Sequence, residues 1–381
     1  MRIAAITNSR IPSLTANSIQ AMKVCQALST LGHTVRLFAP RETDEVAPEA
    51  LRKHYGLRVA PNLELLPSIR GLKRFDFIFH AQRAARRFDA DLIYTWLPQS
   101  AVLALWRGLP VILEMHADVT GRLGPWWLRQ FWKTRGRKRM TVTARALQTA
   151  LERSAGFIIP EGGDFEKEAV MIAPNGVDLE RYENLPSPSN ARRQLNLKEG
   201  LTVGFTGHIY PGRGADLLFE LAKQIPQVYF LWVGGTPELV SYWQEQLNRN
   251  ALTNVTMTGF IEHSRIPLYQ AASDVLLMPY DRSISASSGQ DIAEVINPMK
   301  MFEYMASGRA IVSADLSVIR EVLNEKNAVF CEPGNVNAWR SAIESLLSDE
   351  IRRMALGAQA RKDSERYTWT ERARHILDGF A

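Results

Sequence analysis

The chain has 381 residues, of which 46% are hydrophobic and 23% charged, with a net charge of +6 and two cysteines. This length predicts two domains rather than one core, and the composition is typical of a folded globular protein. Two cysteines far apart exclude a disulfide scaffold or zinc site, and no apolar run reaches the ~18 residues of a membrane span, so we expect a cytoplasmic protein, soluble or peripheral.

Short apolar strands alternate with helical segments over the first half of the chain. We expect strands at RIAAIT, HTVRLFAP, DLIYTW and PVILEM, and helices at NSIQAMKVCQALSTLG, DFIFHAQRAARRF and LPQSAVLALWRG. Alternation at this spacing predicts a right-handed parallel α/β sheet.

Positive charge is concentrated in that half: residues 1–185 hold 26 Lys and Arg against 18 Asp and Glu, whereas residues 186–381 hold 20 against 22. Residues 126–140, WWLRQFWKTRGRKRM, carry six of these cations and three Trp. Such a segment suits an anionic membrane surface or a phosphorylated or lipid-linked substrate. The structural alternative is an amphipathic helix with its Trp side chains packed inward. No other feature supports nucleic-acid binding, which we do not predict.

A cluster of Pro, Ser and Asn without hydrophobic periodicity, residues 183–200, predicts a connection between domains. The strand–helix pattern then restarts at LTVGFTG and continues through VYFLWVGG, NVTMTGF, ASDVLLMPY, GRAIVSAD and NAVFCEP. The sequence therefore predicts two facing, Rossmann-like, doubly wound parallel-sheet domains with ligands beyond the carboxyl ends of the strands.

The segment TGHIYPGRGADLL, residues 206–218, follows a strand, bends at several glycines and opens into a helix. Gly207 and Gly212 allow the backbone to approach a phosphate, and Arg213 supplies a fork of donors that suits a diphosphate. No strand is followed by GxGxxG, which disfavours a nicotinamide dehydrogenase.

A second candidate is INPMKMFEYMASGRAIVSAD, residues 296–315, where a single carboxylate lies in a segment suited to burial. Pro298 predicts a helix start, and Lys300 and Glu303 then lie on one helix face. Either they pair with each other, or both serve a ligand, with Glu303 accepting two ribose hydroxyls and Lys300 meeting phosphate.

A third candidate is His116, which ends a strand two residues before Asp118 and suits a hydrogen bond to a ligand. No His, Cys or Asp cluster has the spacing of a metal site, and neither GxSxG nor HExxH occurs, so we predict neither a metal nor a cofactor.

Together these segments resemble the retaining GT-B glycosyltransferases of glycosyltransferase family 4. The resemblance spans nearly the whole chain and is carried by LGHTVRLF, APNGVDLERY, TGHIYPGRG, TGFIEHSRIPLYQAASDVLLMPY, PMKMFEYMASGRAIVSAD and SERYTWTERARHIL. It implies an acceptor domain over residues 1–185, a nucleotide-sugar domain over 186–365 and a terminal helix, 366–381, that returns to the first domain.

The resemblance also implies residue roles. Glu303 matches the family glutamate that binds ribose, His116 the histidine near the donor sugar, and Ile261 the position where backbone groups contact the base. Arg213 takes the place of the family's phosphate-loop lysine. The expected nucleotide-sugar site also includes Gly207, Gly212, Asn297, Pro298 and Met299.

Three departures from the family pattern concern the phosphate. The family's phosphate-loop arginine is here His208, and Lys300 is the candidate replacement. The nearest carboxylate to the first family glutamate is Glu294, one residue out of register. The N-terminal glycine-rich loop is replaced by SRIPSLTANSIQ, where Asn17 and Ser18 offer donors to the diphosphate.

The function that follows is metal-independent transfer of a hexose, with retention, from a nucleoside diphosphate sugar, with UDP the favoured carrier and GDP its rival. The acceptor is a glycan, a lipid-linked precursor or a small molecule. The basic Trp-rich segment 126–140 favours a lipid-linked or polysaccharide precursor at the inner membrane face, so we expect a role in polysaccharide biosynthesis. Two alternatives remain open: a sugar-nucleotide 2-epimerase, and a catalytically silent nucleotide-sugar-binding subunit.

Overall fold

The computed structural model describes residues 1–42, 46–69, 75–115, 124–143, 170–285, 291 and 293–380. The chain forms two compact units, of which unit 1 comprises Met1–Asn175 with Trp369–Ala381, and unit 2 comprises Gly176–Thr368. The first boundary falls earlier than the predicted residue 185. The reason is that Val177 donates its N–H to the Tyr367 carbonyl at 2.8 Å, and Tyr182 is buried in the core of unit 2.

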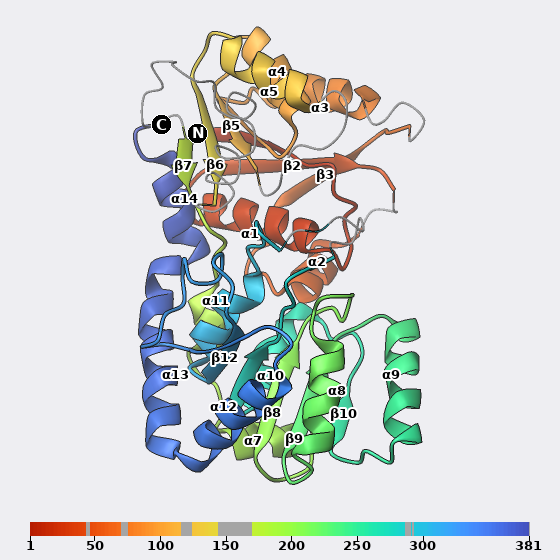
Figure 1. Ribbon diagram of the computed structural model, residues 1–381. Coiled ribbons are helices and arrows are strands. Elements are labelled where there is room, and N and C mark those ends of the chain that lie inside the picture. The colour runs from red at the N-terminus through yellow and green to blue at the C-terminus, as the bar shows by residue number, and fades with distance from the viewer. Residues whose placement is uncertain are drawn as a thin grey trace. The chain divides into compact units, whose positions relative to one another are not determined.

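Unit 1 is built on a parallel sheet with the strand order β3-β2-β1-β4-β5-β6-β7 among the described residues (Figure 1). The chain adds strands on one side of β1 and then resumes on the other side with β4, where Ile3 pairs with Leu92 and Ile6 with Thr95. The strands are β1 (Arg2–Ile6), β2 (Thr34–Pro40), β3 (Asn62–Leu66), β4 (Leu92–Thr95), β5 (Val111–Glu114), β6 (Lys138–Val142) and β7 (Val170–Ile172).

Helices cover this sheet, with α3, α4 and α5 on one side and α1 on the other (Figure 1). The core beneath α3 to α5 consists of Ala, Val, Leu, Ile, Met, Phe and Trp side chains, as the helical periodicity of these segments predicts. The helices of unit 1 are α1 (Ala16–Thr30), α2 (Pro48–Tyr55), α3 (Phe75–Arg87), α4 (Pro98–Trp106), α5 (Gly124–Lys133) and α14 (Trp369–Leu377).

The terminal helix α14 belongs to unit 1 because a buried ion pair holds it there. Arg372 Nη2 lies 2.8 Å from Glu114 Oε1, and both side chains are almost fully enclosed. Glu114 also accepts hydrogen bonds from the Tyr94 hydroxyl and from Gln20 Nε2, the latter at 2.6 Å. A buried charge pair is tolerated only when its remaining hydrogen-bonding capacity is used in this way.

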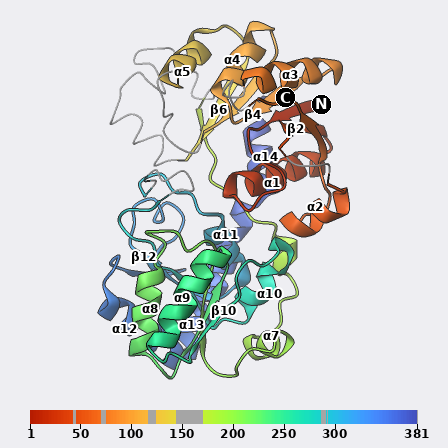
Figure 2. The same ribbon diagram turned by 90° about the vertical axis from the view of Figure 1, so that its right-hand side faces the viewer.

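Unit 2 repeats the architecture with the strand order β10-β9-β8-β11-β12-β13, again parallel throughout (Figure 1). The strands are β8 (Thr202–Thr206), β9 (Tyr229–Val233), β10 (Val255–Met257), β11 (Val275–Met278), β12 (Ala310–Ala314) and β13 (Val329–Cys331). The longer helices are α7 (Pro188–Gln194), α8 (Ala215–Gln224), α9 (Pro237–Arg249), α10 (Ile266–Ala271), α11 (Met299–Ser307), α12 (Val336–Ser348) and α13 (Glu350–Ser364), of which Figure 2 shows α8 and α9 in front. The described part of unit 2 also contains the short 3₁₀ turns η2 (Leu179–Tyr182), η3 (His263–Arg265) and η4 (Glu365–Tyr367).

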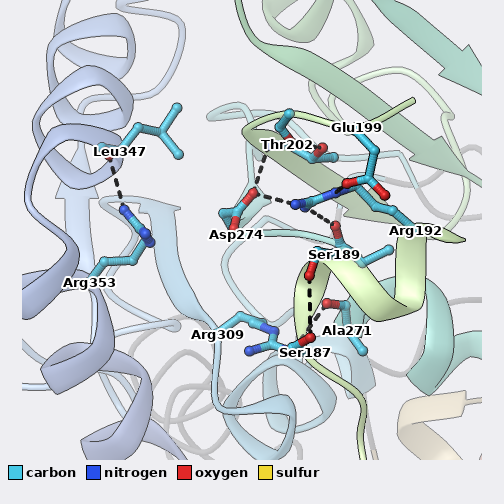
Figure 3. Close-up of polar contacts among 12 residues, drawn as sticks. Ser187, Ser189, Arg192, Glu199, Thr202, Ala271, Asp274, Arg309, Leu347 and Arg353 are labelled. Atoms are coloured by element: carbon cyan, nitrogen blue, oxygen red, sulfur yellow. Dashed lines mark hydrogen bonds and ion pairs between the residues drawn. The ribbon is translucent and has the colours of Figure 1, made fainter. Parts of the chain in front are cut away.

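The segment predicted as a connection, residues 183–200, is instead a folded part of unit 2, because it contains α7. Arg192 of α7 donates to Asp274 Oδ2 at 3.0 Å, and the same oxygen accepts the Thr202 N–H at 2.8 Å (Figure 3). Arg309 donates to the Ala271 carbonyl at 3.1 Å beside this cluster (Figure 3). The sequence signal was weak because α7 has only two turns and is held by polar contacts.

Candidate functional site

The candidate site of unit 2 lies at the carboxyl ends of β8 and β11, where the strand order reverses. Strands β8 and β11 are neighbours, but the chain visits β9 and β10 between them. The loops that follow these two strands are joined backbone to backbone. The Asp281 N–H donates to the Gly212 carbonyl at 3.0 Å, and the Ser285 N–H donates to the Pro211 carbonyl at 3.2 Å. A crevice outside such a reversal is the usual ligand site of open α/β sheets.

Glycine is required in the loop after β8 for two reasons. Gly212 and Gly214 have φ angles of +77° and +86°, a conformation that residues with a Cβ rarely adopt. A Cβ on Gly212 would also overlap the backbone oxygen of Ser283, and one on Gly214 would overlap that of Pro279. The glycines therefore allow the two loops to pack closely, and Gly214 lies directly before α8 as its N-cap.

A hydrogen bond of Tyr304 links helix α11 to the end of β8. The Tyr304 hydroxyl, which is fully buried, accepts the Thr206 N–H at 2.7 Å. This contact places Lys300, one turn earlier on α11, against the glycine loop: a Cβ on Gly207 would lie 2.9 Å from Lys300 Nζ.

The ammonium group of Lys300 is enclosed without a hydrogen-bond partner among the described residues. It lies 3.9 Å from the centre of the Phe205 ring and 5.3 Å from that of Tyr280, so aromatic faces supply its close contacts among the described residues. Burial, and next the positive charge of Arg213, lower the pKa of Lys300 well below its usual range.

Arg213 converges on the same aromatic ring, with its Cζ 5.7 Å from the centre of Tyr280. Its Nη2 makes one long hydrogen bond, 3.5 Å, to the Ser285 carbonyl, and its Nε has no partner among the described residues. Within the described ranges neither Arg213 nor Lys300 forms an ion pair. Two basic side chains without an ion pair in this part of the structure, beside a glycine loop and the start of a helix, are suited to binding a multiply charged anion.

Glu303 does not pair with Lys300, so the structural alternative from the sequence is wrong. Its carboxylate is buried, and Oε1 lies 2.7 Å from Nε2 of His263 on η3. The two side chains of α11 diverge because Lys300 extends toward Phe205 and Gly207, whereas Glu303 faces η3. The carboxylate therefore has a hydrogen-bond partner within the protein before any ligand binds.

Sequence reasoning missed His263 and its neighbour Arg181. Arg181 Nη1 lies 3.2 Å from His263 Nδ1, and Nη2 donates to the His263 carbonyl. Both residues fall in segments that carried the resemblance, APNGVDLERY and TGFIEHSRIPLYQ, but a lone His or Arg has no spacing that marks it. Only the fold brings together positions so far apart in the chain.

The other predicted residues of unit 2 lie in the loops after β8 and β10 and at the start of α11. His208 stacks on Tyr210 with ring centres 4.9 Å apart. Ile261, half-buried, lies two residues before His263 and packs against a small cluster beneath β9. Asn297, Pro298 and Met299 surround the start of α11, for which Pro298 is the N-cap.

The predicted residues of unit 1 are less informative. His116 lies outside the described residues. Asn17 is exposed in the first turn of α1, whereas Ser18 is buried. The Ser18 hydroxyl donates to the Thr15 carbonyl at 2.9 Å and its N–H to the same oxygen at 3.2 Å, so both of its donors are used within the turn that begins α1.

Part of the basic segment 126–140 packs inward as an amphipathic helix would, and part of it lies on the surface, where it could meet a membrane or an anionic substrate. Trp127 and Trp132 are buried in the core of unit 1, and Lys138 caps the end of α5 by donating to the Trp132 carbonyl at 2.7 Å. Trp126 is 44% exposed, and Arg129 and several other cations of the segment lie on the surface. Within the described ranges, no helix is long and apolar enough to cross a membrane, and no three His, Cys, Asp or Glu residues could hold a metal ion.

Comparison with known proteins agrees with this architecture. The family model described as "Glycosyl transferases group 1" matches residues 188–363, and the model described as "Glycosyltransferase Family 4" matches residues 18–181. A D-inositol 3-phosphate glycosyltransferase of Xylanimonas cellulosilytica is 26% identical over 96% of this chain and 91% of its own length.

Two further relatives differ in the nucleotide that their names give. A GDP-mannose-dependent alpha-(1-6)-phosphatidylinositol monomannoside mannosyltransferase of Mycobacterium tuberculosis is 24% identical over 54% of each chain. The structure of Anabaena Alr3699/HepE in complex with UDP-glucose has a TM-score of 0.73 and 19% identity, covering 100% of this chain and 99% of that one. This likeness shows the GT-B fold.

Proposed function

Because this chain is a GT-B glycosyltransferase of family 4, we propose that unit 2 holds a nucleoside diphosphate hexose and that the enzyme transfers the hexose with retention. The observation that carries the proposal is the pair of basic side chains, Arg213 and Lys300, which form no ion pair among the described residues and lie beside the glycine loop and the start of α11.

Each part of the donor has a matching group in unit 2. The diphosphate meets Arg213, Lys300 and the backbone of the loop that contains Gly207, His208 and Gly212. The ribose hydroxyls donate to Glu303. The base lies along the backbone near Ile261, and the start of α11, Asn297, Pro298 and Met299, faces the phosphate with the positive end of the helix.

The chemistry needs stabilisation of the charge that develops on the leaving diphosphate. Preorganised donors of this kind contribute about 2.7–4 kcal/mol each. Arg213 and Lys300 lie in an environment poor in competing hydrogen bonds, where such interactions are stronger than in water. We assign no general base and no metal, and the leaving phosphate accepts the proton of the acceptor hydroxyl.

The role that resemblance suggests for His116, and the donor roles predicted for Asn17 and Ser18 of unit 1, remain part of the proposal, and so does the acceptor. We favour UDP as the carrier, which the UDP-glucose complex of the Anabaena protein supports, while the mannosyltransferase relative makes GDP the rival. Exposed Trp126 and the cations around it support an acceptor presented at the cytoplasmic membrane face, such as a lipid-linked glycan precursor.

A thermal-shift screen of UDP, GDP, ADP and dTDP sugars tests the donor assignment. At a ligand concentration of about 100 times Kd, mass action adds about 2.7 kcal/mol, which corresponds to a rise of roughly 5–10 °C for a domain of this size. A rise confined to one nucleotide supports the proposal, and no rise with any of the four contradicts it. Release of free hexose from that donor without acceptor counts against a silent subunit, and an epimerised donor would indicate the 2-epimerase.

A further inference from the structure

Three side chains from separate elements of unit 2 form a hydrogen-bonded row that ends on the predicted ribose ligand. Arg181 of η2 contacts His263 of η3 through Nδ1 at 3.2 Å, and Nε2 of the same ring lies 2.7 Å from Oε1 of Glu303 on α11. The His263 and Glu303 side chains are only 15% and 10% exposed, so water competes little for these bonds.

The chemistry of the three groups determines where the ring proton lies. A guanidinium has five N–H donors and no acceptor, and it stays charged in proteins. His263 Nδ1 must therefore accept from Arg181 with its lone pair, which leaves the proton of the neutral imidazole on Nε2. Nε2–H then donates to the Glu303 carboxylate.

Arg181 also determines the orientation of the ring. Its Nη1 contacts Nδ1, while its Nη2 donates to the carbonyl oxygen of the same residue. The Arg181 guanidinium thus contacts both the backbone and the side chain of His263. Rotation of the ring would break the Arg181–Nδ1 bond, so the Nε2–H vector stays directed at Glu303.

We propose that His263, with its tautomer and orientation set by Arg181, is the positioning residue for the ribose-binding carboxylate Glu303. This inference rests on the proposed function. His263 lies two residues after Ile261, so the row also connects the segment proposed to contact the base with the carboxylate proposed to hold the ribose. A nucleoside that places its base correctly would then meet a carboxylate already aligned with both ribose hydroxyls.

The test separates alignment of Glu303 from a general structural role. Calorimetric titration would compare UDP and GDP with their 2′,3′-dideoxy forms in the full-length enzyme. We expect wild type to favour the ribose form of its nucleotide by on the order of 100-fold, because two hydroxyls bond to a charged acceptor. In His263→Leu this preference should fall to roughly threefold, while affinity for the dideoxy form stays unchanged.

Two further variants and a control complete the design. His263→Gln retains an amide N–H near the position of Nε2 and should restore most of the ribose preference. Arg181→Met leaves the ring in place but removes its restraint, and should give an intermediate preference. Arg265→Met removes an exposed cation from the same turn, and it should behave as wild type.

The outcomes are distinguishable. If wild type binds no nucleotide, the proposed function fails and this inference fails with it. If wild type prefers ribose but His263→Leu keeps that preference, or weakens both forms equally, only the role of His263 is overturned. Should His263→Leu not fold, a reduced ribose preference in Arg181→Met together with a near wild-type preference in His263→Gln would support the inference. An unchanged preference in Arg181→Met would overturn it.

Discussion

Replacement of Lys300 by Met should stabilise unit 2 and impair diphosphate binding at the same time. Methionine keeps the length and the apolar stem of the side chain but removes the ammonium group. That group is enclosed, has no hydrogen-bond partner among the described residues, and lies near the positive charge of Arg213. Lys300 therefore lowers the free energy of unfolding in the absence of a ligand, as expected of a side chain whose role is to bind one.

The size of the effect follows from two opposing contributions. An enclosed polar group without a partner costs about 1–3 kcal/mol. The contacts with Phe205 at 3.9 Å and Tyr280 at 5.3 Å return about 0.5–2 kcal/mol. The net gain for Lys300→Met is on the order of 1 kcal/mol, or roughly 2–4 °C in Tm. Loss of one charge-assisted contact should weaken nucleoside diphosphate binding about 10- to 150-fold.

The pH dependence of stability gives this prediction a definite sign. The pKa of Lys300 is lowered in the folded protein from its ordinary value of 10.5, so above the lowered pKa the unfolded chain binds more protons at this site. The free energy of unfolding of wild type should therefore rise with pH through the window between that lowered pKa and 10.5. Lys300→Met lacks this rise, so its advantage should shrink as pH increases.

Urea unfolding over a pH series, with calorimetric titration of the nucleotide, measures both effects. The matched control is Lys326→Met, which removes an exposed lysine of the same unit and should change neither stability nor binding. A Lys300→Met variant that is less stable than wild type at neutral pH, or that binds the nucleotide unchanged, would refute the reasoning.

Three other predictions concern the loop, the terminal helix and the thiols. Gly212→Ala should lower the free energy of unfolding, measured in urea, by about 3 kcal/mol or more, because its positive φ and the backbone overlap both oppose a Cβ. Gly334→Ala has a similar φ of +75° but open space around it, so it should lower the free energy of unfolding by about 1–2 kcal/mol. Equal losses of stability in the two variants would contradict this. Arg372→Met leaves the buried Glu114 carboxylate without its cation, so the free energy of unfolding should fall by about 3–5 kcal/mol and the terminal helix should become sensitive to protease. A protease-resistant variant with wild-type stability would contradict this prediction. Burial raises the pKa of Cys331 to about 11 and that of Cys25 further. Neither thiol should therefore react with a thiol reagent at neutral pH until its own unit unfolds. Rapid labelling of the native protein would contradict the burial of these thiols.

Much of the fold was predictable because parallel strands and their helices leave strong periodic patterns. The strands of unit 2 follow the alternation seen in the sequence, whereas β3, β6 and β7 of unit 1 were not predicted. The glycine loop with Arg213 was predictable from a strand–turn–helix pattern. The connection at 183–200 was misjudged since α7 is short and held by polar contacts, such as the Arg192–Asp274 ion pair, that leave no hydrophobic period.

The partners of the site residues were less predictable. Helical spacing placed Lys300 and Glu303 on one face of α11, yet their side chains take different directions because aromatic rings attract one and His263 the other. His263 and Arg181 are separated by many residues from Glu303, and no local pattern indicates that three elements meet there. Contacts between distant segments follow from the packing of the whole unit.

The most direct test of the central claim is titration of the preferred nucleoside diphosphate into Glu303→Gln. Glutamine keeps an oxygen for the His263 N–H but loses the charge that two ribose hydroxyls would share. The account predicts a folded variant with thermal stability close to wild type and affinity reduced about tenfold or more. Wild-type affinity in the variant, or no nucleotide binding by wild type, would contradict the claim that unit 2 holds a nucleoside diphosphate by its pentose.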